Sequence, residues 1–323
     1  MNKTIYWSIL AVIIIVLLFL ILFRSRSPFG KSNSSFAVDQ EKEITKIELA
    51  TGRMKLVLEK KGDVWLINNK SEARKSGIQF ITRVLKDIKI KSTVSSDLFN
   101  SEITGKNIIP VRVKVYGNYK LLSSFLVYKT HSNTYGNIMK IKESSKPFIV
   151  YIPGYDGNIG NAFIANELFW EDYTIFNLLP SEIESVSFEN FSDASSSFKI
   201  SARDQHYTLS GQEGNLTGWD NSLVGRYLSY FARVPFEFWN LDSDDAITGK
   251  IIASQPLYKI TVISNTGKKI ALSLWPMLTG EPGNEKTDSD RLYGKTDEHK
   301  ELFVMRYFDI DPLIKKKSYF FPR

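Results

Sequence analysis

The chain contains two stretches that repeat one another in order, and this internal similarity constrains its fold more than any single motif. The first stretch reads EITKIEL at 43–49, and the second reads EIESVSF at 182–188. Their apolar residues share one spacing: Ile44, Ile47 and Leu49 match Ile183, Val186 and Phe188, and Trp65 and Ile67 match Tyr207 and Leu209. We therefore expect one structural unit to occur twice.

Each copy carries the patterns of strands and of one amphipathic helix. Apolar residues alternate with polar ones at 54–58 and again at 111–115, which is the period of half-buried strands. Between these runs, apolar residues recur at the three- and four-residue spacing of a helix face. This stripe comprises Ile78, Ile81, Val84, Leu85 and Ile88 in the first copy, and Leu223, Val224, Tyr227, Leu228, Phe231 and Val234 in the second.

The later segments of the two copies also correspond. The matching pairs are 111–129 with 258–276, Tyr135-Gly136 with Tyr293-Gly294, and 148–153 with 302–308. The second copy has an additional polar stretch at 279–300, which we expect to be a loop. Three strands, a helix and four strands in each unit predict an α+β fold, since a parallel α/β sheet would alternate strands and helices regularly.

An apolar run at the N-terminus predicts a transmembrane helix. From Ile5 to Phe23 the chain has nineteen residues, of which only Ser8 is clearly polar, close to the ~20 that span a bilayer. Trp7 lies at one end, where aromatic rings favour the membrane interface. A cleaved signal peptide is the competing interpretation, but the run is long for one and no small-x-small cleavage site follows it.

The orientation of this anchor rests on two opposing signals. More basic residues follow the span than precede it, which by the positive-inside tendency would keep the large domain in the cytoplasm. The very short N-terminal tail is the usual architecture of an extracytoplasmic domain held by a signal anchor. We expect a single-pass protein of the bacterial inner membrane with a periplasmic domain.

Composition excludes several classes of partner and site. The net charge is +7, but four of the 42 basic residues flank the span, which leaves 38 basic against 35 acidic residues elsewhere. Such a balance is not the footprint of a nucleic-acid-binding protein. The chain has no cysteine, so disulfides, a lipoprotein anchor and cysteine-based metal sites are excluded.

The sequence predicts six segments along the chain. They are the tail and anchor at 1–23, a linker at 24–42, the first repeat at 43–153, an aromatic connector at 154–181, the second repeat at 182–314, and a basic-aromatic tail at 315–323. We expect the tail, which contains Lys315, Lys316 and Lys317, to be solvated.

No motif nominates a catalytic, cofactor-binding or metal-binding residue. GYDGNIG at 154–160 lacks the ending of a P-loop and the spacing of a dinucleotide fingerprint. His131, His206 and His299 have no metal-ligand spacing, and LDSDDAITG at 241–249 departs from a calcium loop. We expect this acidic stretch to be a solvated loop.

The connector is rich in aromatic residues and offers the candidate partner-binding residues Trp170, Tyr173 and Tyr155. Aromatic residues in such a segment are more often core. Partner binding is therefore one of two interpretations of the connector.

This order of features resembles an uncharacterised bacterial family of membrane-anchored tandem-repeat α+β proteins. The resemblance rests on the anchor, the I-x-x-I-x-L pattern at 44–49, VWLI at 64–67 and FWEDYTIFNLLPSEIESVSF at 169–188, and it spans most of 43–314. Members are often encoded near ABC-type transport genes associated with gliding motility. The resemblance implies no catalytic residues.

These observations predict a non-enzymatic subunit or scaffold of an envelope complex, with an envelope or inner-membrane protein as partner and the lipid bilayer bound through 5–23. The alternative is a module that binds glycan or peptidoglycan, which the aromatic content of 13% allows. An envelope hydrolase ranks third and would require carboxylates such as Asp242 and Asp309 to converge.

Overall fold

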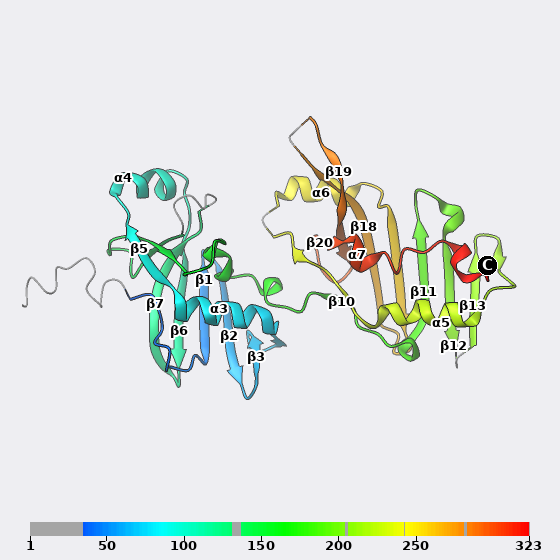
Figure 1. Ribbon diagram of the computed structural model, residues 1–323, viewed down its shortest axis with the longest axis horizontal. Helices are drawn as coiled ribbons and strands as arrows, with labels where there is room; N and C mark the ends of the chain where they lie inside the picture. Colours follow the sequence, from blue (N-terminus) through cyan, green and yellow to red (C-terminus); the bar gives the residue numbers. More distant parts are fainter. Residues whose placement is uncertain (1–34, 131–136, 204–205, 242, 281–282, 323) are drawn as a thin grey trace, which may run out of the picture. The chain divides into compact units, whose positions relative to one another are not determined.

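The computed structural model describes residues 35–130, 137–203, 206–241, 243–280 and 283–322. The chain has a strand-rich α+β architecture with two nine-stranded sheets (Figure 1). It divides into two compact units, Met1–Asp172 and Tyr173–Arg323, and each unit contains one of these sheets.

The sheet of the first unit is antiparallel throughout and has the order β4-β3-β2-β1-β6-β7-β8-β9-β5. Its strands are β1 (Lys46–Thr51), β2 (Met54–Lys61), β3 (Val64–Ile67), β4 (Ser71–Glu72), β5 (Lys89–Thr93), β6 (Val111–Gly117), β7 (Lys120–Tyr128), β8 (Asn137–Lys140) and β9 (Phe148–Tyr151).

Helical segments cover both faces of the first sheet. On one face lies α3 (Lys75–Asp87), whose buried residues include Ile78, Ile81, Val84 and Leu85; this confirms the helix predicted from the apolar stripe. On the other face, α4 (Ser96–Phe99) and the π-helical turn η1 (Asn100–Thr104) pack on the β7–β9 end of the sheet. Phe99 and Tyr128 meet edge to face there, with ring centroids 5.2 Å apart.

The sheet of the second unit is also antiparallel and has the order β14-β13-β12-β11-β17-β18-β19-β20-β16. Its strands are β11 (Ile183–Asn190), β12 (Phe198–Arg203), β13 (His206–Gly211), β14 (Gly214–Asn215), β16 (Phe238–Trp239), β17 (Tyr258–Ser264), β18 (Lys269–Thr279), β19 (Lys286–Thr296) and β20 (Phe303–Arg306). A separate two-stranded pair joins β10 (Thr174–Phe176) to β15 (Val234–Pro235).

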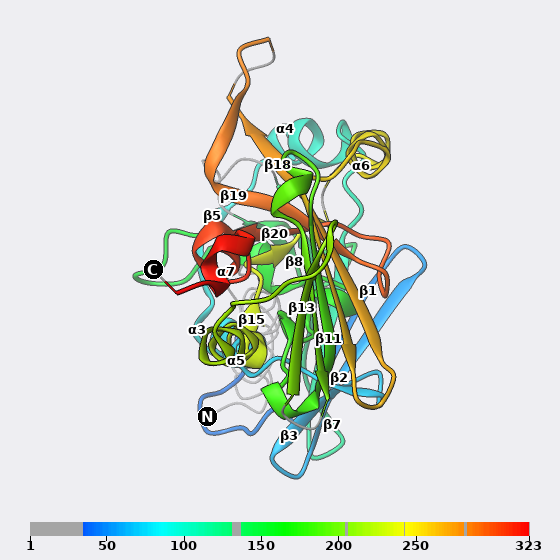
Figure 2. The ribbon, with the colours of Figure 1, turned by 90° about the vertical axis from the view of Figure 1, so that its right-hand side faces the viewer.

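The helices of the second unit are also placed on both sides of their sheet. Figure 2 shows α5 (Asn221–Ser229) and α7 (Tyr307–Ile310) on one side and α6 (Asp245–Ala253) on the other. The helix predicted from Leu223 onward begins as expected but ends early, because Phe231 lies in a 3-10 turn and Val234 lies in β15.

Matching residues take matching places in the two ladders. Ile47 and Leu49 of β1 pair with Val115 and Val113 of β6. In the second unit, Val186 and Phe188 of β11 pair with Val262 and Ile260 of β17. All eight side chains are at most 2% exposed. The apolar positions that the two stretches share are therefore the positions whose side chains face the core in both units.

The strand register changes one of the matches that the sequence predicted between the two copies. Tyr128 of β7 pairs with Ile138, while Trp275 at the equivalent place in β18 pairs with Tyr293. The counterpart of Tyr293 is therefore Ile138. The dipeptide Tyr135-Gly136, to which the sequence matched it, lies outside the described residues.

The stretch at 279–300, expected to be a loop, is largely strand. Strands β18 and β19 remain paired as far as Thr279 and Lys286 and project from the sheet as a hairpin (Figure 1). The outer part of β19 is mostly exposed on both faces. An apolar period of two is consequently absent there, because neither face of the hairpin packs on a core.

Candidate functional site

Trp170 is a core residue of the first unit. Its side chain is 0% exposed, and its indole Nε1 donates a 2.8 Å hydrogen bond to the carbonyl oxygen of Ile164. The ring borders α3, where a Cβ added to Gly77 would lie 3.4 Å from it. A fully buried ring offers no surface to a partner, so the structure assigns Trp170 to the core rather than to an interface.

The other two candidate partner-binding residues are half-buried. Tyr173 belongs to the second unit, where its ring stacks on Phe236 with centroids 4.8 Å apart. Tyr155 belongs to the first unit, and its ring lies 5.7 Å from that of Phe80 on α3. The structure therefore does not bring the three candidates together as one site within a unit.

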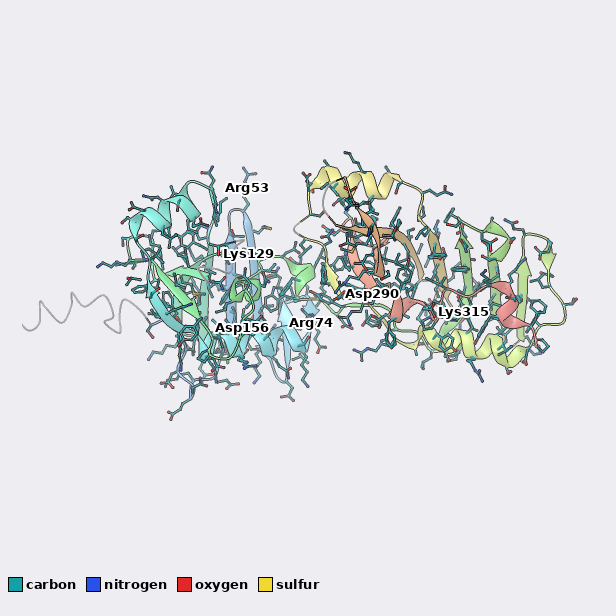
Figure 3. The ribbon with its side chains drawn as sticks, turned by 45° about the horizontal axis from the view of Figure 1, so that its top comes forward. Arg53, Arg74, Lys129, Asp156, Asp290 and Lys315 are labelled. Carbon is teal, nitrogen blue, oxygen red and sulfur yellow. The ribbon has the colours of Figure 1, made fainter. Side chains whose placement is uncertain are left out.

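The segment around Trp170 has a counterpart at the end of the second unit. The backbone N–H of Arg74, which precedes α3 (Figure 3), donates a 2.6 Å hydrogen bond to the carbonyl oxygen of Trp170. The N–H of Asp220, which precedes α5, donates to the carbonyl oxygen of Phe320 at 2.8 Å. We call 154–172 and 307–320 the closing segments, because each follows the last inner strand and returns to the start of the helix.

The second closing segment packs into the core of its unit. Phe320 is 0% exposed, and its ring meets Phe198 and Tyr227 edge to face at 4.8 and 5.3 Å. The Tyr227 hydroxyl donates a 3.0 Å hydrogen bond to the carbonyl oxygen of Leu313. Burial raises the pKa of Tyr227 far above its usual value, so this hydroxyl stays a neutral donor. The expectation of a solvated tail at 315–323 is therefore wrong.

Two segments that were expected to lie outside the first repeat, one in the connector and one in the linker, belong to the first unit. Residues 154–172, expected in a connector, lie within the first unit. Phe36 and Val38, expected in the linker, are 2% and 3% exposed in the first core. A segment of irregular backbone shows neither the apolar period of a helix nor that of a strand, so the sequence pattern does not distinguish it from a linker.

The acidic residues and histidines do not assemble a chemical centre among the described residues. Asp244 caps α6 by accepting the N–H of Ala246 at 2.8 Å, so the acidic stretch expected to be a loop includes the start of a helix. Asp309 lies in α7, and Asp242 lies outside the described residues. No group of three His, Asp or Glu side chains suited to a metal ion occurs in the part of the chain that is described.

The predicted membrane anchor also lies outside the described residues. Ile5, Trp7 and Phe23 precede residue 35, where the description begins. From residue 35 onward, none of the described helices combines the length and apolar character needed to span a bilayer.

A groove of about 1120 Å³, lined by both polar and apolar side chains, lies within the second unit. The strand residues that line it include Ser185 of β11, Lys199, Ser201 and Arg203 of β12, and Ile263 of β17. Lys199 and Ser201 alternate with Phe198 and Ile200, which are buried toward α5. Because successive strand residues point to opposite faces, Ser185, Lys199 and Ser201 face away from α5. Tyr207 instead borders Gly225 of α5, and Asn221 is the first residue of that helix, so residues from both faces of the sheet line the groove. At its rim lie Leu179, Ser181, Glu184, Tyr207, Asn221 and Asn265.

Several polar side chains of the groove have no partner within the described ranges. In the described part of the chain, the side chains of Ser185 and Ser201 make no hydrogen bond, and those of Lys199 and Arg203 make no salt bridge. Among the described lining residues, the exposed Glu184 is the one carboxylate beside these two cations. The groove therefore presents hydroxyl groups and an excess of positive charge to solvent.

Sequence reasoning missed this groove, although the internal repeat contained a signal for it. The first-unit counterparts of the cross-strand pair Ser185 and Ser201 are Lys46 and Glu59, which pair across β1 and β2. The apolar matches identified the core, but these polar mismatches mark where the two copies diverge.

Comparison with models of protein families, with curated proteins and with solved structures finds no match to the chain. The resemblance to a bacterial family accordingly stays a prediction.

Proposed function

We propose that the protein is a non-enzymatic, membrane-anchored scaffold subunit of a bacterial envelope complex. Its two units arose by duplication of one α+β unit, and they are held outside the cytoplasm by the span expected at 5–23. The resemblance stated above points to a complex of the ABC-transport or gliding-motility type. The lipid bilayer and an envelope or inner-membrane protein are the partners of this proposal.

One observation carries the proposal: both sheets have the same strand order and leave the outward face of their central strands open. In the first unit, β1, β2 and β6 alternate buried residues with half-buried or exposed ones. The outward set mixes both signs of charge, as in Lys46, Glu48, Lys55, Arg112 and Lys114. Such a face suits a protein surface of complementary charge, whereas nucleic acid favours a concentration of one sign.

The duplication supports a binding role because it explains which residues were kept. Positions facing the helices remained apolar in both copies, while outward positions changed, as at Lys46 and Ser185. Residues that only hold a fold together are expected to stay alike, and residues that contact different partners are expected to diverge. The outward faces are therefore the surfaces on which the proposal places binding.

The test is co-purification of the tagged full-length protein from native membranes in mild detergent, with mass spectrometry of accompanying proteins. The proposal expects a stoichiometric envelope or membrane protein. The double variant Lys55→Glu and Lys114→Glu should release it, because two outward positive charges are reversed.

The control is Lys75→Glu, at the exposed start of α3, which reverses one positive charge outside the outward face. It should retain the partner, and all variants should keep the thermal midpoint of the wild type. Purification of the wild-type protein alone at high yield, or equal loss of the partner in the control, would contradict the proposal.

A further inference from the structure

The groove of the second unit lies where small side chains replace the larger charged and aromatic side chains of the first unit. In the first unit, Lys46 forms a 3.2 Å ion pair with Glu48, and its Nζ lies over the ring of Tyr116, 5.7 Å from the centroid. The second unit has Ser185 in the place of Lys46 and Ile263 in the place of Tyr116. Shorter side chains at these positions leave room for the groove of the second unit.

The groove contains hydroxyl groups that form no hydrogen bond with the described residues. The hydroxyls of Ser185 and Ser201 lie directly across from one another on β11 and β12. Neither has a hydrogen-bond partner among the described residues, although Ser185 is only 7% exposed. Hydroxyl groups that are mostly withdrawn from solvent are suited to a ligand that both donates and accepts hydrogen bonds.

The charges and the apolar surface narrow the class of ligand. Lys199 and Arg203 favour an anion, and a guanidinium binds a carboxylate or a phosphate through two parallel hydrogen bonds. Two cations are too few for the backbone of a nucleic acid, whose binding typically neutralises several phosphates. Ile263, which pairs with Ser185 across the strands, adds apolar surface against which the face of a sugar ring can lie.

We propose that this groove binds an acidic saccharide, with Lys199 and Arg203 on its carboxylate and Ser185 and Ser201 on its hydroxyl groups. Its volume of about 1120 Å³ leaves room for an oligomer. This site lies on the outward face of the second sheet, whereas the test of the protein partner proposed above changes Lys55 and Lys114 of the first unit. One proposal can therefore fail while the other holds.

Isothermal titration of the full-length protein in detergent with tetragalacturonate tests the site. A neutral tetrasaccharide, cellotetraose, and inorganic phosphate serve as comparison ligands. Tetragalacturonate should bind at least about tenfold more tightly than either, since it offers both the charge and the hydroxyl groups.

The variant Lys199→Ala with Arg203→Ala should weaken tetragalacturonate binding at least about tenfold. A second variant, Ser201→Glu, introduces the residue that the first unit carries at the equivalent position. It should also weaken tetragalacturonate binding, because the glutamate fills part of the groove and adds a negative charge to it. Lys250→Ala, on the exposed surface of α6 and away from the groove, is the control and should bind like the wild type.

Three results would overturn the proposal. The first is no tetragalacturonate binding by the wild type at millimolar concentration. The second is equal binding of the neutral saccharide or of phosphate. The third is unchanged binding in both groove variants, provided that their thermal midpoints match that of the wild type.

Discussion

The two units bury equivalent residues beneath their helices but carry different side chains on the outward faces of their sheets. Ile47 and Val186 occupy one core position, and both are 0% exposed. On the outward face, the pair Lys46 and Glu59 is replaced by Ser185 and Ser201. Burial of apolar surface constrains the inward positions in both copies, whereas solvent-facing positions are free to acquire separate tasks.

The closing segments extend this comparison beyond the sheets. Trp170 and Phe320 are both fully buried, and each accepts a hydrogen bond from the residue before the helix of its unit. Their surroundings differ, because the Trp170 indole has its own acceptor in Ile164 whereas Phe320 packs within a cluster of rings. One task, closing the core beside the helix, is thus performed by two different aromatic residues.

Removal of either closing aromatic is expected to have the largest effect. Trp170→Ala and Phe320→Ala should each lower the free energy of unfolding by about 3 to 5 kcal/mol, because each leaves a large cavity in a core. Hydrogen exchange followed by mass spectrometry should show loss of protection in the mutated unit. A Trp170→Ala protein of unchanged stability that loses a binding partner would instead place this ring at an interface.

A glycine in the second unit tests how closely the two cores are packed. Phe303 covers Gly294, where an added Cβ would lie 2.2 Å from the ring, whereas the first unit has Met139 at the equivalent place, beside Phe148. Gly294→Ala should lower the free energy of unfolding by about 1 to 3 kcal/mol through overpacking.

The matched control for this glycine is Gly249→Ala in α6. A Cβ there meets no atom within 4 Å, so the change should raise stability by up to about 1 kcal/mol through helix propensity. Chemical denaturation of both variants measures the contrast, and destabilisation of similar size in the two would refute it.

A charged clamp found in the second unit should produce a smaller, pH-dependent effect. The Glu237 carboxylate accepts two hydrogen bonds from Arg291, at 2.7 and 3.0 Å, and one from Arg306 at 3.0 Å. These arginines, Arg291 foremost, lower the pKa of Glu237 to about 2. The residue of β9 equivalent to Arg306 is Tyr151, which carries no such charge.

The pKa of Glu237 is lower in the folded protein than its usual value of about 4.5. Its contribution to the free energy of unfolding is therefore complete above that usual value and falls as the pH drops toward 2. Glu237→Gln should lower the free energy of unfolding by about 1 to 2 kcal/mol at pH 7. Urea denaturation at pH 7 and pH 3 should show a smaller difference from the wild type at the lower pH. A difference independent of pH would exclude the carboxylate as its cause.

The smallest effect is expected at the hairpin of β18 and β19. Leu278 is 57% exposed, and Leu278→Ser should change the free energy of unfolding by less than about 0.5 kcal/mol. Leu274 of the same strand is 0% exposed, and the same substitution there should cost several times more. Thermal unfolding of the two variants measures this contrast, which equal effects would contradict.

Sequence patterns predicted those parts of the fold in which apolar residues recur with a fixed period. The stripe from Ile78 to Leu85 identified α3, and the matching stretches at 43–49 and 182–188 identified equivalent inner strands. The apolar residues of α4 and η1 were not recognised, because a single turn is too short to show a helical period.

The groove and the closing segments escaped prediction for a different reason. The groove depends on strand register, which decides that Ser185 and Ser201 lie side by side. The closing segments depend on tertiary contacts, such as that between Asp220 and Phe320, which are about a hundred residues apart in sequence. Neither feature has a local pattern, although comparison of the two copies at polar positions would have marked the groove.

The most direct test of the common plan is residue-resolved hydrogen exchange of the Arg74 and Asp220 amides in the full-length protein. If each closing segment seals its unit, both amides should exchange as slowly as those of β1 and β11. Trp170→Ala should release only Arg74, and Phe320→Ala should release only Asp220. Exchange of either amide at the rate of an exposed loop in the wild-type protein would contradict the account.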